Sequence, residues 1–180
     1  MSMMRVRGFT LIEIMITIVV LVIILAVAVP NLSDLLRRHR LWTQADSFAS
    51  ALSLARSAAI SRNTCGAVIA TDGDANWRQG WMAFVDANCN RAFDAGEIRL
   101  AQSGALPDAM TATFLSSDPG APYVLYSPVG YTRTAAAGPM QAVMTFADGD
   151  HLRRVRINAL GRARTCEQAS DASCTGVNDE

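Results

Sequence analysis

The chain contains no lysine. All 16 of its basic side chains are arginine, and 16 acidic side chains balance them, so the formal net charge is zero. A neutral chain has no overall attraction to nucleic acid or to acidic lipid. The composition therefore excludes a uniformly basic binding protein, and any electrostatic binding must come from a local cluster of arginines.

Histidine is also scarce. The two histidines, His39 and His151, fall in different predicted elements. The spacing of the side chains offers no combination of a nucleophile, a base and an orienting acid. The sequence also has no phosphate-binding loop and no metal-ligand cluster. It therefore predicts a protein that is not an enzyme and that holds no cofactor or metal.

Four cysteines are present, at positions 65, 89, 166 and 174. Their number is even, their spacings are not those of a metal site, and they follow a predicted membrane span. This combination favours two disulfides in an oxidising compartment. Three connectivities are open, and proximity in the sequence favours Cys65 with Cys89 and Cys166 with Cys174.

Residues 9–29 form an apolar run in which Glu13 is the one charged side chain. A helix of these 21 residues, at ~1.5 Å per residue, spans roughly 30 Å, the thickness of the hydrocarbon core of a bilayer. The run therefore predicts a transmembrane helix. A carboxylate in such a segment costs ~3 kcal/mol or more to insert, so Glu13 is a functional candidate. The alternative is a Glu that reaches toward the nearby end of the span.

The start of the chain differs from a secretory signal, because the small residue Gly8 precedes the apolar run instead of following it. The segment from Gly8 to Glu13, Gly-Phe-Thr-Leu-Ile-Glu, resembles the prepilin leader site of type IV pilins and type II secretion pseudopilins. The resemblance implies that a prepilin peptidase and N-methyltransferase cuts between Gly8 and Phe9 and methylates Phe9. It also implies that Glu13 neutralises the terminal amine of a neighbouring pilin in the filament. Before assembly, the chain would lie in the inner membrane with a periplasmic C-terminal domain, and afterwards in an extracellular pilus.

The remaining sequence predicts an α+β fold. The helix continues to residue 62, with an apolar stripe of Leu41, Ala45, Phe48, Leu52, Ala55 and Ala59. Residues 63–166 then contain short strands without helices between them, which favours an antiparallel sheet. The predicted strands are 66–71, 80–86, 97–102, 111–116, 123–127, 141–147 and 152–158, and the last two would form a hairpin at Asp148-Gly149. Residues 1–8 are the predicted leader and 167–180 a polar tail.

A second resemblance lies in residues 77–97, which include Trp77, Gly80-Trp81 and a turn rich in Asp and Asn. This stretch resembles the domain shared by pseudopilin H of type II secretion and the FimT and FimU minor pilins. The resemblance implies a minor subunit that helps to start the filament near its tip. Within the stretch, Asp86, Asn88, Asn90 and Glu97 have the spacing of a calcium loop, but Arg91 replaces its glycine. A turn-rich hairpin loop is therefore the favoured interpretation.

Five arginines and no acid lie between residues 153 and 164. In a strand, Arg154 and Arg156 share a face, and Arg162 and Arg164 repeat that spacing. Such a strip suits phosphate, because each guanidinium donates two parallel hydrogen bonds. Residues 161–164, Gly-Arg-Ala-Arg, also resemble a motif of FimT-type minor pilins for which binding of double-stranded DNA during natural transformation is implied. The alternative is ion pairing of these arginines with Asp148, Asp150, Glu167 or neighbouring subunits.

Three functions therefore remain open. The first is a structural minor pilin of a type IV pilus, and the second, compatible with it, is a DNA-binding module on the same scaffold that uses the arginine strip. The third is a minor pseudopilin acting in the piston of a type II secretion system.

Overall fold

The computed structural model of the chain describes residues 9–73, 75–167, 170–171, 173–174 and 177, with the backbone alone for residues 27–31. The predicted leader, residues 1–8, and much of the predicted tail lie outside the described residues. The chain divides into two compact units, Met1–Arg38 and His39–Glu180. Helix α1 (Leu11–Arg62) contributes to both units, and each unit is described by itself.

Defined caps begin and end α1. The Glu13 backbone N–H donates to the carbonyl oxygen of Thr10 at 3.1 Å and lies 3.3 Å from its hydroxyl, which fixes the first turn. At the other end, Asn63 adopts a left-handed φ of 50°, and the N–H of Thr64 donates to the carbonyl of Ala59. This is the Schellman arrangement, which satisfies carbonyls that the last helical turn leaves free.

In the first unit, α1 presents large apolar side chains to solvent on every side, from Leu11 at 79% exposed to Leu25 at 48%. A helix that is apolar all round needs cover from lipid or from other protein. Within the residues whose side chains are described, no helix has both the length and the hydropathy needed to cross a membrane.

In the second unit, α1 packs closely on the strands that follow it. All six residues of the predicted apolar stripe are buried, which confirms the predicted packing face. Many of them are alanines, and β1 (Cys65–Ala70) contributes Gly66 at the contact. A Cβ atom at Gly66 would lie 2.2 Å from the Ala55 carbonyl oxygen, so only glycine fits beneath the helix there.

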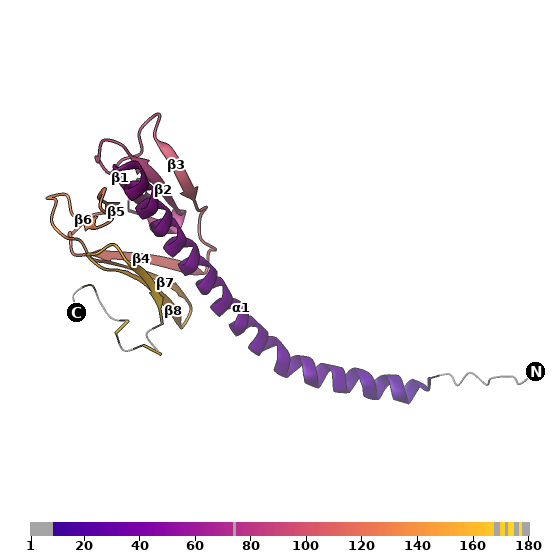
Figure 1. Cartoon of the computed structure of the whole chain (residues 1–180). Coiled ribbons are helices and arrows are strands. Elements are labelled where there is room, and N and C mark those ends of the chain that lie inside the picture. The colour runs from indigo at the N-terminus through magenta and orange to yellow at the C-terminus, as the bar shows by residue number, and fades with distance from the viewer. Residues whose placement is uncertain (1–8, 74, 168–169, 172, 175–176, 178–180) are drawn as a thin grey trace, which may run out of the picture. The chain divides into compact units, whose positions relative to one another are not determined.

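Two antiparallel sheets complete the second unit (Figure 1). The five-stranded sheet has the order β3-β2-β1-β5-β6, and the four-stranded sheet has the order β4-β7-β8-β9. The other strands of the first sheet are β2 (Trp81–Asp86), β3 (Ile98–Gln102), β5 (Tyr123–Tyr126) and β6 (Thr132–Arg133). The second sheet consists of β4 (Met110–Ser116), β7 (Ala142–Asp148), β8 (His151–Ile157) and β9 (Ala163–Cys166).

One aromatic cluster joins α1 to both sheets. The Phe48 ring of α1 contacts Trp81 of the first sheet at 5.3 Å between ring centroids and Phe146 of the second at 6.1 Å. Trp77, from the short 3-10 helix η1 (Trp77–Gln79), contacts the same ring edge to face at 5.7 Å. The core therefore combines aromatic side chains of α1, of the segment containing η1 and β2, and of β7, and the Phe48 ring contacts the other three rings.

The seven predicted strands are confirmed, each within one residue at either end, and the α+β class with them. The predicted hairpin at Asp148-Gly149 is also confirmed, since Asp148 pairs with His151 and Gly149 has a φ of 60°. Two strands were not predicted, β6 and β9. The first is only two residues long, and the second contains two polar side chains among its four residues, so neither has a hydrophobic alternation to reveal it.

Candidate functional site

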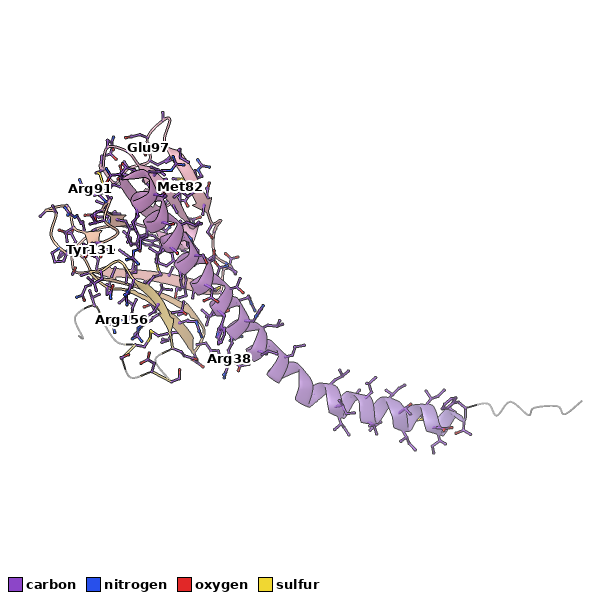
Figure 2. All side chains as sticks on the ribbon, viewed as in Figure 1. Arg38, Met82, Arg91, Glu97, Tyr131 and Arg156 are labelled. Atoms are coloured by element: carbon purple, nitrogen blue, oxygen red, sulfur yellow. A yellow bond between two sulfur atoms is a disulfide. The ribbon has the colours of Figure 1, made fainter. Side chains whose placement is uncertain are left out.

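The arginines at the end of the chain gather on one face of the four-stranded sheet. Val155 and Ile157 of β8 are buried in the core, so Arg154 and Arg156 point to the opposite face. Arg164 of β9 stands directly across from Arg156 in the strand pairing and shares that face. The predicted grouping of these three side chains is thus present, and Figure 2 labels Arg156 on this part of the molecule.

One detail of the predicted strip is wrong, the strand spacing of Arg162. This residue precedes β9 and belongs to the turn between β8 and β9. The Asn158 side-chain oxygen accepts a hydrogen bond from the Arg162 backbone N–H at 2.9 Å. Gly161 takes a left-handed φ of 77°, and a Cβ there would lie 2.1 Å from the Gly130 carbonyl oxygen. A tight turn therefore replaces the continuous strand spacing, and it leaves the Arg162 side chain exposed.

We call Arg154, Arg156, Arg162 and Arg164 the arginine face. Three of these residues, Arg156, Arg162 and Arg164, line a pocket of ≈ 240 Å³ together with Asn158 and residues of β7. Like charges directly opposite each other on paired strands repel, so Arg156 and Arg164 need an anion or a carbonyl dipole nearby. The pocket therefore combines several guanidinium donors with room for a small anionic group.

Residues near the C-terminus supply oxygen acceptors to this face. The Arg164 guanidinium pairs with the Asp171 carboxylate at 3.2 Å and donates to the Ser173 hydroxyl at 2.7 Å. The guanidinium of Arg156 donates to the Ser173 carbonyl, and that of Arg154 donates to the Cys174 carbonyl. Hydrogen bonds from Ser173, followed by the charges of Arg164 and Arg156, lower the pKa of the Asp171 carboxyl. Sequence reasoning missed these acceptors.

Arg153 lies apart from the arginine face. Its guanidinium carbon is 3.9 Å from the centroid of the Trp42 ring on α1, which is a cation–π contact. The Arg153 Nη1 atom lies 3.9 Å from a Glu167 carboxylate oxygen. The predicted alternative of ion pairing therefore holds for Arg153 with Glu167, whereas the pair of Arg164 with Asp171 was not predicted.

A hydrogen-bonded clamp from α1 fixes the turn that carries Arg162. The Arg56 Nε atom donates to the Gly130 carbonyl at 2.9 Å, and its Nη2 atom donates to the Leu160 carbonyl at 3.0 Å. The β5–β6 turn and the β8–β9 turn are thereby joined to the helix. No local pattern of residues indicates this role, because the three segments are far apart along the chain.

Replacing Arg56 with methionine, which keeps most of the side-chain volume, tests the clamp. Two charge-assisted hydrogen bonds are lost and two carbonyls lose their donor, so the free energy of unfolding should fall by about 1–3 kcal/mol. Urea denaturation of the second unit measures this change. The matched variant Arg99→Met, on the exposed edge strand β3, should alter stability by less than about 0.5 kcal/mol. Equal effects from both would contradict the clamp.

The predicted hairpin loop after β2 is held by its own side chains. The Asp86 carboxylate accepts backbone N–H groups of Asn90 at 3.0 Å and Arg91 at 2.8 Å, while burial raises the pKa of this carboxyl. The Glu97 carboxylate accepts the N–H of Ala87 at 2.8 Å and that of Asp94 at 3.0 Å.

The other polar side chains of this loop are paired too, since the amides of Asn88 and Asn90 donate to Asp94. Across the described residues, no group of three or more His, Cys, Asp or Glu side chains is placed to hold a metal. Figure 2 shows Glu97 well apart from Arg156, so this loop is separate from the arginine face.

Both predicted disulfides are present, Cys65–Cys89 and Cys166–Cys174. The first links β1 to the loop after β2. The second closes a short loop after β9, and this loop contains the acceptors Asp171 and Ser173. Each of the described cysteines is therefore paired, in the connectivity that proximity favoured.

The predicted assembly residues, Gly8, Phe9 and Glu13, belong to the first unit. Gly8 is outside the described residues. Phe9 is 75% exposed, and Glu13 lies in the exposed first turn of α1. The roles of these residues in cleavage, methylation and pairing between subunits stay predictions.

Two family models match the chain, one near its N-terminus and one over most of the second unit. Residues 44–161 match the family described as Type II transport protein GspH, and residues 3–29 match the prokaryotic N-terminal methylation motif. Pilin-like protein PilA1 of Thermus thermophilus is 33% identical over 165 residues, which cover 88% of this chain and 97% of PilA1.

Two solved structures share the fold. The type IV minor pilin FimU of Pseudomonas aeruginosa superposes with a TM-score of 0.56 at 19% identity, covering 77% of this chain and 97% of FimU. The minor pseudopilin EpsH from the Type 2 Secretion System of Vibrio cholerae has a TM-score of 0.50 at 15% identity, covering 72% and 98%. The chain therefore belongs to the Type II transport protein GspH family, and it joins the pilin and pseudopilin fold to a prokaryotic N-terminal methylation motif.

Proposed function

We propose that the chain is a minor pilin of a type IV pilus that helps to start filament assembly near the tip. The observation that carries this proposal is the similarity to a pilin-like protein over 97% of that protein's length. The match to the methylation motif supports the same assignment at residues 3–29. Its partners are the prepilin peptidase and N-methyltransferase, and other major and minor pilins.

The first unit supplies the chemistry of assembly. Cleavage between Gly8 and Phe9 and methylation of Phe9 leave an apolar helix with a terminal amine. The large side chains of this helix, from Leu11 to Leu25, are about half exposed or more in the single chain. Before assembly, the inner membrane buries these side chains, and the second unit lies in the periplasm. In the extracellular filament, neighbouring helices bury them. Glu13 then pairs with the amine of the next subunit.

The second candidate is a minor pseudopilin of a type II secretion system. The name of the matching family and the likeness to EpsH favour this alternative. Mass spectrometry of sheared surface pili separates the two functions. A minor pilin is recovered with the filaments in small amounts, whereas a pseudopilin is absent from them and its deletion blocks the release of secreted enzymes.

The arginine face supports a further activity of the pilus, non-specific binding of double-stranded DNA for natural transformation. Arg162 is exposed, and Arg156 and Arg164 line the same pocket. Guanidinium groups spaced along two neighbouring strands suit successive phosphates of a DNA backbone. Binding of this kind carries no sequence preference and weakens steeply with salt.

The double substitution of Arg162 and Arg164 by glutamine tests the DNA proposal. Retention of a labelled duplex by the full chain in detergent should be abolished at low salt, because two phosphate contacts are lost. Where residual binding is measurable, the slope of log K against log salt should shrink by up to about 1.8. The variant Arg78→Gln with Arg99→Gln removes the same charge from η1 and β3 and should bind as the wild type does. Unchanged retention in the first variant would remove the proposal.

A further inference from the structure

The loop closed by the Cys166–Cys174 disulfide places oxygen atoms on three of the four residues of the arginine face. Asp171 supplies a carboxylate to Arg164, and Ser173 supplies its hydroxyl to the same guanidinium. The carbonyl oxygens of Ser173 and Cys174 accept from Arg156 and Arg154. The side chain of Arg162 has no such contact with a described residue. The loop therefore contacts three of the four guanidinium groups that a DNA backbone would use.

The chemistry of these acceptors resembles that of a phosphate group. A phosphodiester presents anionic oxygens that accept hydrogen bonds from guanidinium forks, and a carboxylate beside carbonyl and hydroxyl oxygens presents similar acceptors. A guanidinium donates in a fixed planar geometry, so a donor engaged by the loop is not available to a phosphate. We infer that the loop closed by Cys166–Cys174 is an internal competitor for DNA on the arginine face, so that its release strengthens DNA binding.

The Cys166–Cys174 disulfide holds the loop close to the arginine face, which favours the loop over DNA in the competition. Cys174 is fully buried and Cys166 is 6% exposed, so the loop is fastened at both ends beside the arginines. A tethered group has a high effective concentration at its site, whereas DNA must displace it from solution. The competition is nevertheless limited, because the ion pair of Arg164 with Asp171 is half-exposed and such pairs are weak. The loop thus moderates binding by the face without closing it.

The inference rests on the proposed DNA binding, and substitution of Asp171 by asparagine tests it. The full chain in detergent is titrated with a short labelled duplex at several salt concentrations, and anisotropy reports the affinity. Asp171→Asn keeps the shape of the side chain and removes its charge. The affinity should rise about twofold to fivefold, as expected for the loss of one exposed ion pair. The slope of log K against log salt should steepen by up to about 0.9, because Arg164 becomes more fully available to phosphate.

Glu167→Gln is the matched control, because it makes the same change in net charge beside the same loop. Glu167 faces Arg153, which stacks on Trp42 and lies outside the arginine face. This variant should bind DNA as the wild type does. A second test replaces Cys166 and Cys174 with serine, which should raise the affinity at least as much as Asp171→Asn. Its control is the matching pair at Cys65 and Cys89, which should leave the affinity unchanged.

The outcomes separate the two ideas. Tighter binding by Asp171→Asn than by Glu167→Gln supports the competitor. If the wild type binds DNA and the loss of Arg162 and Arg164 abolishes that binding, while Asp171→Asn has no effect or weakens binding, the competitor fails alone. If neither the wild type nor the two loop variants bind DNA, the proposed DNA binding fails and the competitor falls with it.

Discussion

Replacing Glu13 with glutamine is expected to reduce recovery of the chain in sheared filaments by about tenfold or more. In the proposed filament, the carboxylate of Glu13 meets the terminal amine of the neighbouring subunit. An ionised pair surrounded by apolar side chains is favourable only when both charges are present, and removing one leaves the other buried and unpaired. Glutamine has nearly the same shape, so the loss measures the charge. Immunoblotting of the filament and membrane fractions gives the ratio.

Thr17→Val provides the control for this experiment. Thr17 is another polar side chain of the same segment, but its hydroxyl already donates to the Ile14 carbonyl at 2.8 Å within the helix. Its replacement should leave recovery in the filament unchanged. Mass spectrometry of the mature N-terminus must show Phe9 as the first residue in both variants, so that a failure of cleavage is not mistaken for a failure of assembly. Wild-type recovery of the glutamine variant would exclude the proposed pair.

Most of the fold could be predicted because its signals are local. The apolar stripe of α1 repeats every three or four residues, and all of its members are buried. The seven predicted strands lie between turns rich in Gly, Asp and Pro, and so their predicted bounds are accurate to one residue, whereas β6 and β9 have no such signal. The disulfide pairing followed from proximity, since the pairs are separated by 24 and 8 residues.

The candidate site was predicted only in part, because its remaining features depend on contacts between distant segments. Arg154 and Arg156 share a face as the strand period requires. The turn that displaces Arg162 needs the Asn158 side chain and the approach of Gly161 to Gly130, which no local pattern specifies. The position of Asp171 on Arg164 is likewise a long-range result of the disulfide and the strand pairing. Composition marks the last residues as a polar tail, and polarity alone does not distinguish a loose tail from a bound loop.

Gly66→Ala should lower the free energy of unfolding of the second unit by about 3 kcal/mol. The new Cβ would meet the Ala55 carbonyl oxygen at 2.2 Å and the Ala59 Cβ at 3.3 Å. The first of these atoms belongs to the backbone of α1, so no rotamer change relieves the overlap and the helix must move off β1. In a strand without this contact, alanine would be the better residue by about 0.5–1 kcal/mol. The sign of the measured change therefore reports the contact with the helix.

Urea denaturation of the unit from His39 onward measures this change, with Gly104→Ala as the control. A Cβ at Gly104 meets no atom within 4 Å, so this variant should keep its stability within about 0.5 kcal/mol. The double variant of Gly66→Ala with Ala55→Gly tests whether the overlap is with the backbone of α1. Ala55→Gly removes a side chain but leaves the obstructing carbonyl in place, so it should not restore stability. Equal stability of the Gly66 and Gly104 variants would contradict the close contact between α1 and β1 at Gly66. A loss confined to Gly66→Ala identifies this glycine as the residue that lets the long helix reach the sheet.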